Sequence, residues 1–313
     1  MEERLLLLLT FADQALADKN YLKKSCETFD VNLKVLIRNP WPQNVIKLKL
    51  LYEFLSQADP DLIVLVTDAY DVAITSSSNK ILSRFKAQGA DVLFSGESNF
   101  MYKEPKKWIS FLRKYPKQAT IFQFLNSGSY IGTAQKLKEM LEQIQKQLEI
   151  DLCDEQKLIP IKSDQYVLSR FYVESSFASN DLTLKIDSNH ELLGVTGGRF
   201  CVLKFPDLSR WQAFAFFIFE RNILKLFKLH RHQKVPKDYE ARNGFFYNRR
   251  TGTSPPVMHF PGTWDRFDKV YDELLAGKVP EKSDGWIFAA LVSFICYPLS
   301  ILASPFFWLI TRK

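Results

Sequence analysis

Short apolar runs alternate with stretches of helical spacing through the first third of the chain. A continuous apolar run of this length is typical of a strand that is buried on both faces of a parallel sheet. The alternation therefore predicts an α/β fold with a doubly wound, mainly parallel sheet and flanking helices. The expected strands are residues 5–10, 31–37, 62–66 and 91–95, and the expected helices are residues 16–26, 45–55 and 81–88.

Beyond residue 95 the alternation becomes less regular. The remaining expected strands are residues 122–125, 184–187 and 201–205, and the expected helices are residues 137–148 and a helix that Asp164 opens. Residues 211–229 are apolar and aromatic on one side and basic on the other. That pattern is typical of an amphipathic helix at a membrane surface, and equally of a helix that packs on the core.

Residues 286–310 form an apolar segment that no charged residue interrupts. As a helix the segment is long enough to cross a bilayer core, and Trp286 and Trp308 mark its ends as interfacial aromatics do. Pro298 and Pro305 leave a kinked span or a re-entrant hairpin as alternatives, and a buried core helix is a third. We expect one domain over residues 1–280, then a spacer and a membrane segment over residues 281–313.

The amino terminus has none of the features of a secretion signal. Residues 1–4 are mainly acidic, and the apolar run that follows is too short for a signal peptide. We therefore expect a single-pass chain that the C-terminal segment anchors, with most of the chain on the cytosolic side of the membrane.

The net charge of +7 is concentrated in two basic clusters, at residues 103–117 and 221–250. Such clusters form either an ordinary solvated face or a surface that attracts anionic lipid or an acidic partner. No nucleic-acid-binding motif accompanies them, so we expect no nucleic-acid partner. The four cysteines are far apart and show no metal-ligand spacing, which argues against a disulfide framework.

An acidic motif, Thr-Asp-Ala-Tyr-Asp at residues 67–71, directly follows the apolar run at 62–66. Residues at the end of a parallel strand lie at the carboxyl edge of the sheet, where open α/β sheets bind ligands. Asp68 and Asp71 repel one another unless a positive group lies between them. A divalent cation that holds a diphosphate meets both conditions. The motif therefore predicts a metal-dependent nucleotide site.

Further motifs follow the acidic one in order along the chain. They are Phe-Ser-Gly-Glu-Ser at 94–98, Phe-Leu-Asn-Ser-Gly at 124–128, Ile-Gly at 131–132, Asp-Gln at 164–165, Leu-Lys-Ile-Asp at 184–187 and Val-Met-His-Phe-Pro-Gly at 257–262. The ordered set resembles the glycosyltransferase domain of the procollagen lysyl hydroxylases and the related procollagen galactosyltransferase-like enzymes. The resemblance covers roughly residues 5–275.

This resemblance implies a GT-A-type fold and a UDP-sugar donor that binds with Mn²⁺, with Mg²⁺ as the alternative. It implies that Asp68, Asp71 and His259 are the metal ligands. Two carboxylates and an imidazole suit Mn²⁺ better than Mg²⁺, because imidazole is the softer ligand. By residue type alone, the aspartates also suit a helix N-cap and a turn, and an isolated histidine is more often structural.

Four residues are assigned to donor binding besides the three proposed metal ligands, of which Asp68 belongs to both groups. Tyr70 would stack on the uracil or the ribose, Lys47 matches a family lysine near the donor, and Thr10 ends the first strand beside the nucleotide. Gly262 closes the loop over the diphosphate. Core packing remains the alternative for Tyr70, a solvated helix position for Lys47 and an ordinary loop position for Thr10.

Asn126 and Asp164 are implied on the acceptor side, where the corresponding family segments border the transferred sugar. Asp164 would act as a general base toward an acceptor hydroxyl, or would stabilise positive charge on the sugar. The alternatives are a helix N-cap for Asp164 and a turn residue for Asn126.

Only one aspartate precedes Gln165, where the family has a pair. Three further features depart from the family pattern. The family's His-Gly-Asn-Gly is His-Phe-Pro-Gly at 259–262, the tryptophan that follows the family's Ser-Ala-Glu-Ser is replaced by Asn-Phe-Met-Tyr at 99–102, and the apolar tail stands where the family has a hydroxylase domain. The leading hypothesis is a membrane-anchored, metal-dependent glycosyltransferase that moves a sugar from a UDP-sugar to a hydroxyl on a protein, lipid or glycan. The alternative is a catalytically silent module that binds a partner at a membrane. A metal phosphohydrolase lacks a second ligand cluster.

Overall fold

The computed structural model describes residues 5–98, 111, 114–118, 120–175, 182–196, 239–242 and 245–261. Its helices are α1 (Tyr21–Thr28), α2 (Ile46–Leu55), α3 (Ser78–Gln88), α5 (Ala134–Leu148), α6 (Glu155–Leu158) and α7 (Asp164–Ser175), with a 3₁₀ turn at Ile159–Ile161. Its strands are β1 (Leu6–Ala12), β2 (Asn32–Ile37), β3 (Ile63–Asp68), β4 (Val72–Ile74), β5 (Val92–Glu97), β6 (Phe124–Thr133), β7 (Leu184–Asp187), β8 (Leu193–Val195), β9 (Tyr239–Arg242), β10 (Phe245–Asn248) and β11 (Val257–His259).

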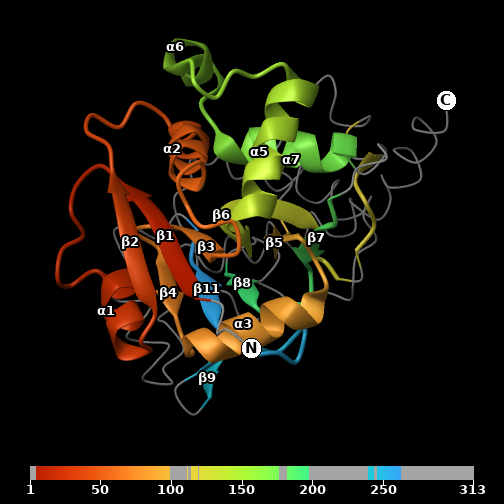
Figure 1. The fold of residues 1–313 in the computed structure, drawn as a ribbon. Coiled ribbons are helices and arrows are strands. Elements are labelled where there is room, and N and C mark those ends of the chain that lie inside the picture. Colours follow the sequence, from red (N-terminus) through yellow and green to blue (C-terminus); the bar gives the residue numbers. More distant parts are fainter. Residues whose placement is uncertain are drawn as a thin grey trace, which may run out of the picture.

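Six of these strands form the main sheet, in the order β2-β1-β3-β6-β5-β7. Five strands share one direction, as the sequence predicts, and β6 runs antiparallel between β3 and β5. The fold is therefore α/β with a mixed, mainly parallel sheet and flanking helices (Figure 1). The expectation of a mainly parallel sheet is confirmed, with β6 as the antiparallel strand.

Asn126 lies in a strand, although its side-chain oxygen accepts the Gly128 N–H two residues on, as in an Asx turn. Residues 124–133 continue as one strand, β6, and its register against β5 shifts between Phe94 and Ser95. Phe94 pairs with Tyr130, whereas Ser95 pairs with Asn126, so the residues between them bulge out of the ladder. A bulge re-aims side chains locally, and here it lies directly beside the candidate site.

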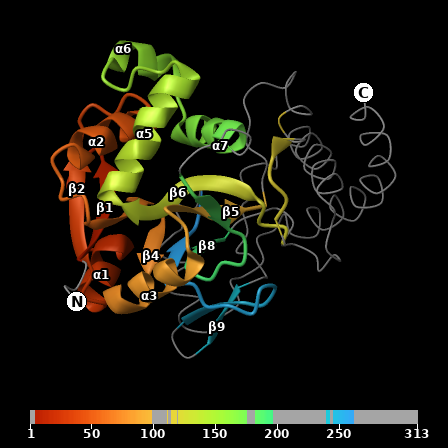
Figure 2. The same ribbon diagram turned by 45° about the vertical axis from the view of Figure 1, so that its right-hand side comes forward.

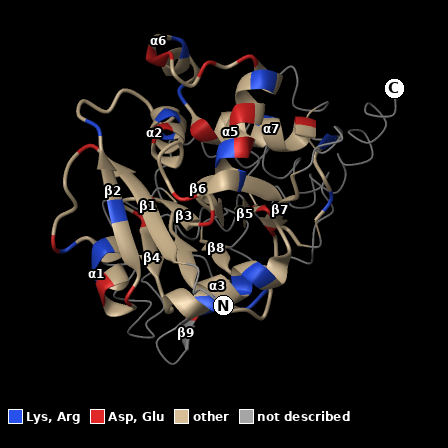
Figure 3. Cartoon of the chain, in the orientation of Figure 1, with Lys and Arg blue, Asp and Glu red and all other residues tan. Residues whose placement is uncertain are grey.

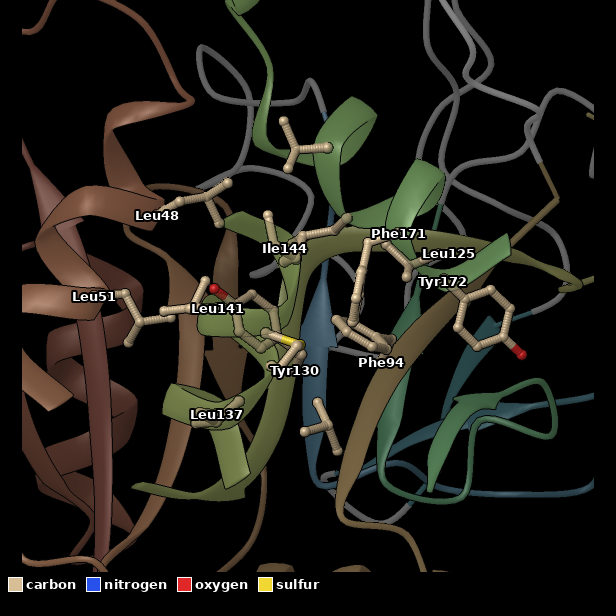
Figure 4. Close-up of a cluster of buried hydrophobic side chains, with 14 of the residues drawn as sticks. Leu48, Leu51, Phe94, Leu125, Tyr130, Leu137, Leu141, Ile144, Phe171 and Tyr172 are labelled. Atoms are coloured by element: carbon tan, nitrogen blue, oxygen red, sulfur yellow. The ribbon is translucent and has the colours of Figure 1, made fainter. Parts of the chain in front are cut away.

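Helices cover both faces of the main sheet, and alternate strand residues point to opposite faces. Leu9 and Phe11 of β1 contact the cluster beneath α2, α5 and α7, whereas Leu6 and Leu8 contact the cluster shared with α1 and α3. Figures 1 and 2 show these two helical layers on opposite sides of the strands. Figure 4 shows the first cluster, in which Phe94 and Tyr130 meet the leucines of α2 and α5.

A second, three-stranded sheet lies on the α1 and α3 side and has the order β4-β11-β8. β4 follows β3 directly in the chain, whereas β11 comes from the far end of the described residues. His259 of β11 pairs antiparallel with Val72 of β4 and parallel with Val195 of β8. The expected strands included neither β4 nor β8. Their pairing brings two distant parts of the chain together at the edge of the main sheet.

Most charged side chains of the described residues lie on helices and loops, and the strands of the main sheet carry few (Figure 3). Within the described ranges, no helix has both the length and the apolar character that crossing a membrane requires. The predicted membrane segment at 286–310, the domain boundary at 280, and the expected elements at 201–205 and 211–229 lie outside the described residues.

Candidate metal centre and active site

Asp68 and Asp71 lie where the chain passes from the main sheet to the small one. Asp68 is the last residue of β3, and Asp71 directly precedes β4. Asp71 is buried and Asp68 is half-buried. Because strands hold the backbone on both sides of this short connection, the two carboxylates are fixed at the carboxyl edge of the main sheet.

His259 reaches the same place from the other end of the described chain. It is the last residue of β11, and only 3% of it is exposed. Its Nε2 atom lies 3.5 Å from Asp71 Oδ1 and 3.6 Å from Asp68 Oδ2. One potential ligand atom from each of the three residues lies within 4.8 Å of the other two. The structure thus brings together the three residues that the sequence proposes as metal ligands.

The chemistry of this group fits a divalent cation. His259 Nε2 is buried and has no hydrogen-bond partner, and a buried polar atom in that state costs about 1–3 kcal/mol. A cation between the imidazole and the carboxylates would satisfy Nε2 and would offset the repulsion between Asp68 and Asp71. Carboxylate oxygens with one imidazole nitrogen are donors that suit Mn²⁺.

The other ring nitrogen of His259 is held by β6. Nδ1 lies 2.9 Å from Asn126 Oδ1, and the same oxygen accepts the backbone N–H of Gly128 at 2.9 Å. Because Oδ1 is an acceptor, the proton belongs on Nδ1, and in the neutral ring the lone pair of Nε2 then faces the carboxylates. Metal-binding histidines commonly donate their second N–H in this way.

Lys47 and Asp164 lie on the opposite side of Asp68. The Lys47 ammonium, from the first turn of α2, forms an ion pair with Asp68, and it lies 3.5 Å from Asp164 Oδ2 at the start of α7. Asp164 is buried. Lys47 therefore connects the candidate metal centre with the carboxylate that the sequence places on the acceptor side.

Burial and neighbouring charges act together on the pKa values of this group. Burial raises the pKa of Asp68, but the charge of Lys47 and then that of His259 outweigh burial, so the pKa lies below its ordinary value. Burial lowers the pKa of His259, but Asp71 and Asp68 outweigh it and raise the pKa. Burial raises the pKa of Asp164, and the opposing charge of Lys47 offsets only part of the shift.

Residues 2–198 match the family model described as the PLOD GT domain. This range is more than half of the 313 residues. The chain belongs to the PLOD GT domain family. The resemblance that the ordered motifs indicate is thereby confirmed up to residue 198. Both aspartates of the candidate metal centre lie within the matched range of the PLOD GT domain, whereas His259 lies beyond it.

Curated relatives of this PLOD GT domain are much longer proteins. The chain is 30% identical over 220 residues to a Drosophila melanogaster protein named procollagen-lysine,2-oxoglutarate 5-dioxygenase, covering 58% of this chain and 30% of that one. It is 29% identical over 147 residues to the Homo sapiens protein named multifunctional procollagen lysine hydroxylase and glycosyltransferase LH3, covering 46% of this chain and 18% of that one. The chain thus spans less than a third of either relative.

Among solved structures, one similar to this PLOD GT domain is titled as a glycosyltransferase involved in the glycosylation of the major capsid of PBCV-1. The TM-score is 0.40 at 11% identity, covering 86% of this chain and 98% of that chain. The family assignment rests on the sequence match over residues 2–198.

The remaining residues predicted for donor binding occupy different surroundings in the chain. Thr10 is fully buried in β1, and its hydroxyl donates to the Thr67 carbonyl at 2.8 Å. Tyr70, which stands between the two aspartates in the sequence, is half-buried, and its hydroxyl donates to Asp13. Burial, together with that hydrogen bond, raises the pKa of Tyr70 to about 12. Gly262 lies outside the described residues. The donor-binding roles of these residues stay predictions.

The sequence analysis assigned no role to Glu97 or Gln165, yet both belong to this site. Asn126 Nδ2 donates to Glu97 Oε1 at 3.1 Å, and Gln165 Nε2 donates to the same oxygen at 2.5 Å. Glu97 is buried at the end of β5. The sequence did contain one sign of this role: Glu97 ends an apolar strand, and a carboxylate that is buried there needs polar partners.

Proposed function

We propose that this PLOD GT domain transfers a sugar from a UDP-sugar to a hydroxyl acceptor, with a divalent cation held by Asp68, Asp71 and His259. The observation that carries the proposal is the buried His259 Nε2, which has no hydrogen-bond partner and faces two carboxylates. Mn²⁺ is the proposed ion, and Mg²⁺ is the alternative, because the imidazole favours the softer of the two. When bound, the ion would neutralise the diphosphate and act as a Lewis acid for its departure.

Lys47 and Tyr70 would contribute to donor binding in this proposal. Only 12% of the Lys47 side chain is exposed, and it lies beside Asp68, so its ammonium can supply positive charge close to a bound diphosphate. The Tyr70 ring lies between Asp68 and Asp71 in the chain and is half-buried, which leaves part of it available for stacking on a base or ribose.

Asp164 is the proposed base toward the acceptor hydroxyl. Its burial raises its pKa, and a carboxylate with a raised pKa is a stronger proton acceptor when it is ionised. Lys47 at 3.5 Å favours the ionised form. The name of the human relative includes a glycosyltransferase activity, which supports sugar transfer as the reaction. The acceptor class in our proposal is a protein, lipid or glycan hydroxyl.

A membrane anchor and a cytosolic catalytic domain belong to the same proposal. Their support is the sequence of residues 286–310, which is apolar and free of charge. Alkaline carbonate extraction of membranes from cells that produce the full chain tests the anchor. Protease treatment of sealed vesicles reports the side on which the domain lies. Complete release by carbonate would contradict the anchor.

The activity is tested with the purified chain, a panel of UDP-sugars and Mn²⁺. We expect donor hydrolysis or transfer that a chelator abolishes. Asp71→Asn should lower this activity at least about 100-fold, because it removes one charged ligand. Glu142→Gln is the matched control: it is also a carboxylate-to-amide change, on the outer side of α5, and should retain activity.

Calorimetry of UDP binding separates the proposal from its alternative. An enzyme should bind UDP more tightly with Mn²⁺ than without it. A folded chain that shows no metal-dependent affinity for UDP, and no activity with any donor, would support the silent binding module instead. The departures at residues 260–261 and the lone aspartate before Gln165 are the features that favour that alternative.

A further inference from the structure

The imidazole of His259 is useful as a metal ligand only in one of its neutral forms. The lone pair must be on Nε2, which faces Asp68 and Asp71, and the proton must be on Nδ1. The opposite tautomer would point an N–H at the position where a cation is proposed. The residues that select the tautomer therefore decide whether the ligand is ready before the metal arrives.

Asn126 is the residue in contact with Nδ1, and its amide can be oriented in only one way. Its Oδ1 is 2.9 Å from the Gly128 backbone N–H, which is always a donor. Its Nδ2 is 3.1 Å from a carboxylate oxygen of Glu97. A flipped amide would place nitrogen against the N–H and oxygen against the carboxylate, so both contacts would become repulsive.

Glu97 is fixed in turn by a second amide. Gln165, the second residue of α7, donates to Glu97 Oε1 at 2.5 Å and to the Leu125 carbonyl at 3.3 Å. Ser95 donates to the Asn126 carbonyl at 3.0 Å. The chain of contacts therefore runs from α7 through β5 and β6 to β11, and all of its polar partners except Gln165 are buried.

We propose that Asn126 is a positioning residue that holds His259 in the tautomer with a proton on Nδ1, with Glu97 and Gln165 fixing the orientation of its amide. The inference rests on the proposed function for its consequence, which is tighter metal binding. The assignment of the tautomer itself rests on the hydrogen bonds of Asn126, not on the proposed function; they hold the proton on Nδ1 against the carboxylates of Asp68 and Asp71, which favour a proton on Nε2. In this role Asn126 acts through His259 and need not touch a substrate.

Two variants test the hydrogen bonds that link Glu97, Asn126 and His259. Asn126→Ala removes the acceptor for Nδ1. The double variant Asn126→Asp with Glu97→Gln keeps the net charge and the hydrogen bonds of residue 126: the new carboxylate accepts from His259 and Gly128, and the new amide at position 97 donates to it. The bond from Gln165 is lost, because Gln165 and Asn126 donate to the same Glu97 oxygen, which the variant replaces by nitrogen. The matched control is Asn248→Ala, which removes another buried asparagine, one that contacts His190 instead.

The first readout is the protonation of the ring, measured by nitrogen NMR of histidine-labelled protein without metal at alkaline pH. The full chain has four histidines, so the His259→Gln variant assigns the signal. The wild type and the double variant should show a proton on Nδ1. Asn126→Ala should show a mixture of tautomers, and Asn248→Ala should leave the His259 signals unchanged.

The second readout is Mn²⁺ affinity, measured by calorimetry without a donor. Removal of a residue that orients a metal-binding histidine typically costs about 10–100-fold in affinity. We expect that loss for Asn126→Ala, and we expect wild-type affinity or better for the double variant. The double variant also provides a test if Asn126→Ala fails to fold.

The outcomes separate this inference from the proposed function. A wild-type protein that binds no Mn²⁺ overturns the proposed function. In that case the nitrogen NMR signals of His259 still show whether Asn126 determines the tautomer. Asn126→Ala protein that keeps both the Nδ1 proton and wild-type Mn²⁺ affinity overturns the inference. A folded double variant that loses the Nδ1 proton overturns it as well.

Discussion

At the scale of the residue, the ring of His259 occupies the space that a side chain at position 128 would need. A Cβ built on Gly128 would lie 2.0 Å from Cε1 and 2.4 Å from Nδ1 of His259. Non-bonded heavy atoms in proteins do not approach one another so closely. The glycine of the Asn-Ser-Gly motif thus provides the room in which the histidine and Asn126 make contact.

Replacing Gly128 by alanine should move the His259 ring. We expect Gly128→Ala to cost about 1–3 kcal/mol in the free energy of unfolding, as overpacking of a core does, and to lower Mn²⁺ affinity. Gly89→Ala is the control, because Gly89 ends α3 at a φ of +54° and its substitution is also strained, yet nothing there touches the site. Urea unfolding and calorimetry measure the two effects, and equal Mn²⁺ affinity in both variants would contradict the expectation.

The sequence predicted the residues of the candidate site unevenly, for physical reasons. Asp68 and Asp71 could be found because both lie within one short motif at the end of an apolar run. His259 could be named only through the family resemblance, since no local pattern links residue 259 to residue 71. Glu97 and Gln165 could not be assigned, because their contacts depend on how β5, β6 and α7 meet.

At the scale of the element, the boundaries of several helices were predictable and the direction of one strand was not. The spacing of apolar residues predicted α2 and α3 to within a few positions. The pattern of β6 does not reveal its direction, because a strand buried on both faces has the same apolar pattern whichever way it runs. The strands of the small sheet are too short for their patterns to stand out.

The first turn of α1 is tied to the acidic motif by one side chain. Asn20 caps the helix by accepting the Lys23 N–H at 3.0 Å, and its Nδ2 donates to the Ala69 carbonyl at 3.0 Å. Ala69 lies between Asp68 and Asp71 in the chain. A single residue therefore both caps the start of α1 and holds the connection that carries the two carboxylates.

Asn20→Ala should consequently have two effects. Loss of the cap should lower the free energy of unfolding by about 1 kcal/mol, and release of the Ala69 carbonyl should weaken Mn²⁺ binding. Thr133→Ala removes the cap of α5, where Thr133 accepts the Lys136 N–H at 3.2 Å, without touching the acidic motif. We expect Thr133→Ala to lose a similar amount of stability and to keep its Mn²⁺ affinity. Calorimetry measures the affinity of both variants, and equal affinities would contradict a role of Asn20 in holding the acidic motif.

At the scale of the whole molecule, His190 joins parts that are distant in sequence. Its Nε2 donates to the Gly96 carbonyl at 2.8 Å, and its Nδ1 faces the Tyr239 hydroxyl at 2.6 Å and Asn248 Nδ2 at 3.0 Å. The ring is fully buried and stacks on Phe122. Because Nδ1 accepts from its neighbours, the folded protein holds this histidine neutral.

The neutral His190 predicts a loss of stability in mild acid. Burial lowers its pKa to about 4, whereas an unfolded chain binds the proton at a pH of about 6.5. Between these values the unfolded state carries more protons, so the free energy of unfolding falls as the pH drops from about 6.5 to about 4, by at most about 1.4 kcal/mol per pH unit. Urea unfolding across this range should show a smaller slope for His190→Gln than for the wild type; equal slopes would contradict the assignment.

The pairing of β11 with β4 and β8 also has a consequence for the order in which the protein is made. The ribosome delivers both carboxylates early and the imidazole much later. A nascent chain therefore cannot assemble the proposed site until β11 has been made and has paired with β4 and β8. A fragment that ends at residue 198, where the matched family region ends, lacks His259 and would not form the complete proposed site. Binding of the ion at this site would therefore require synthesis at least as far as residue 259.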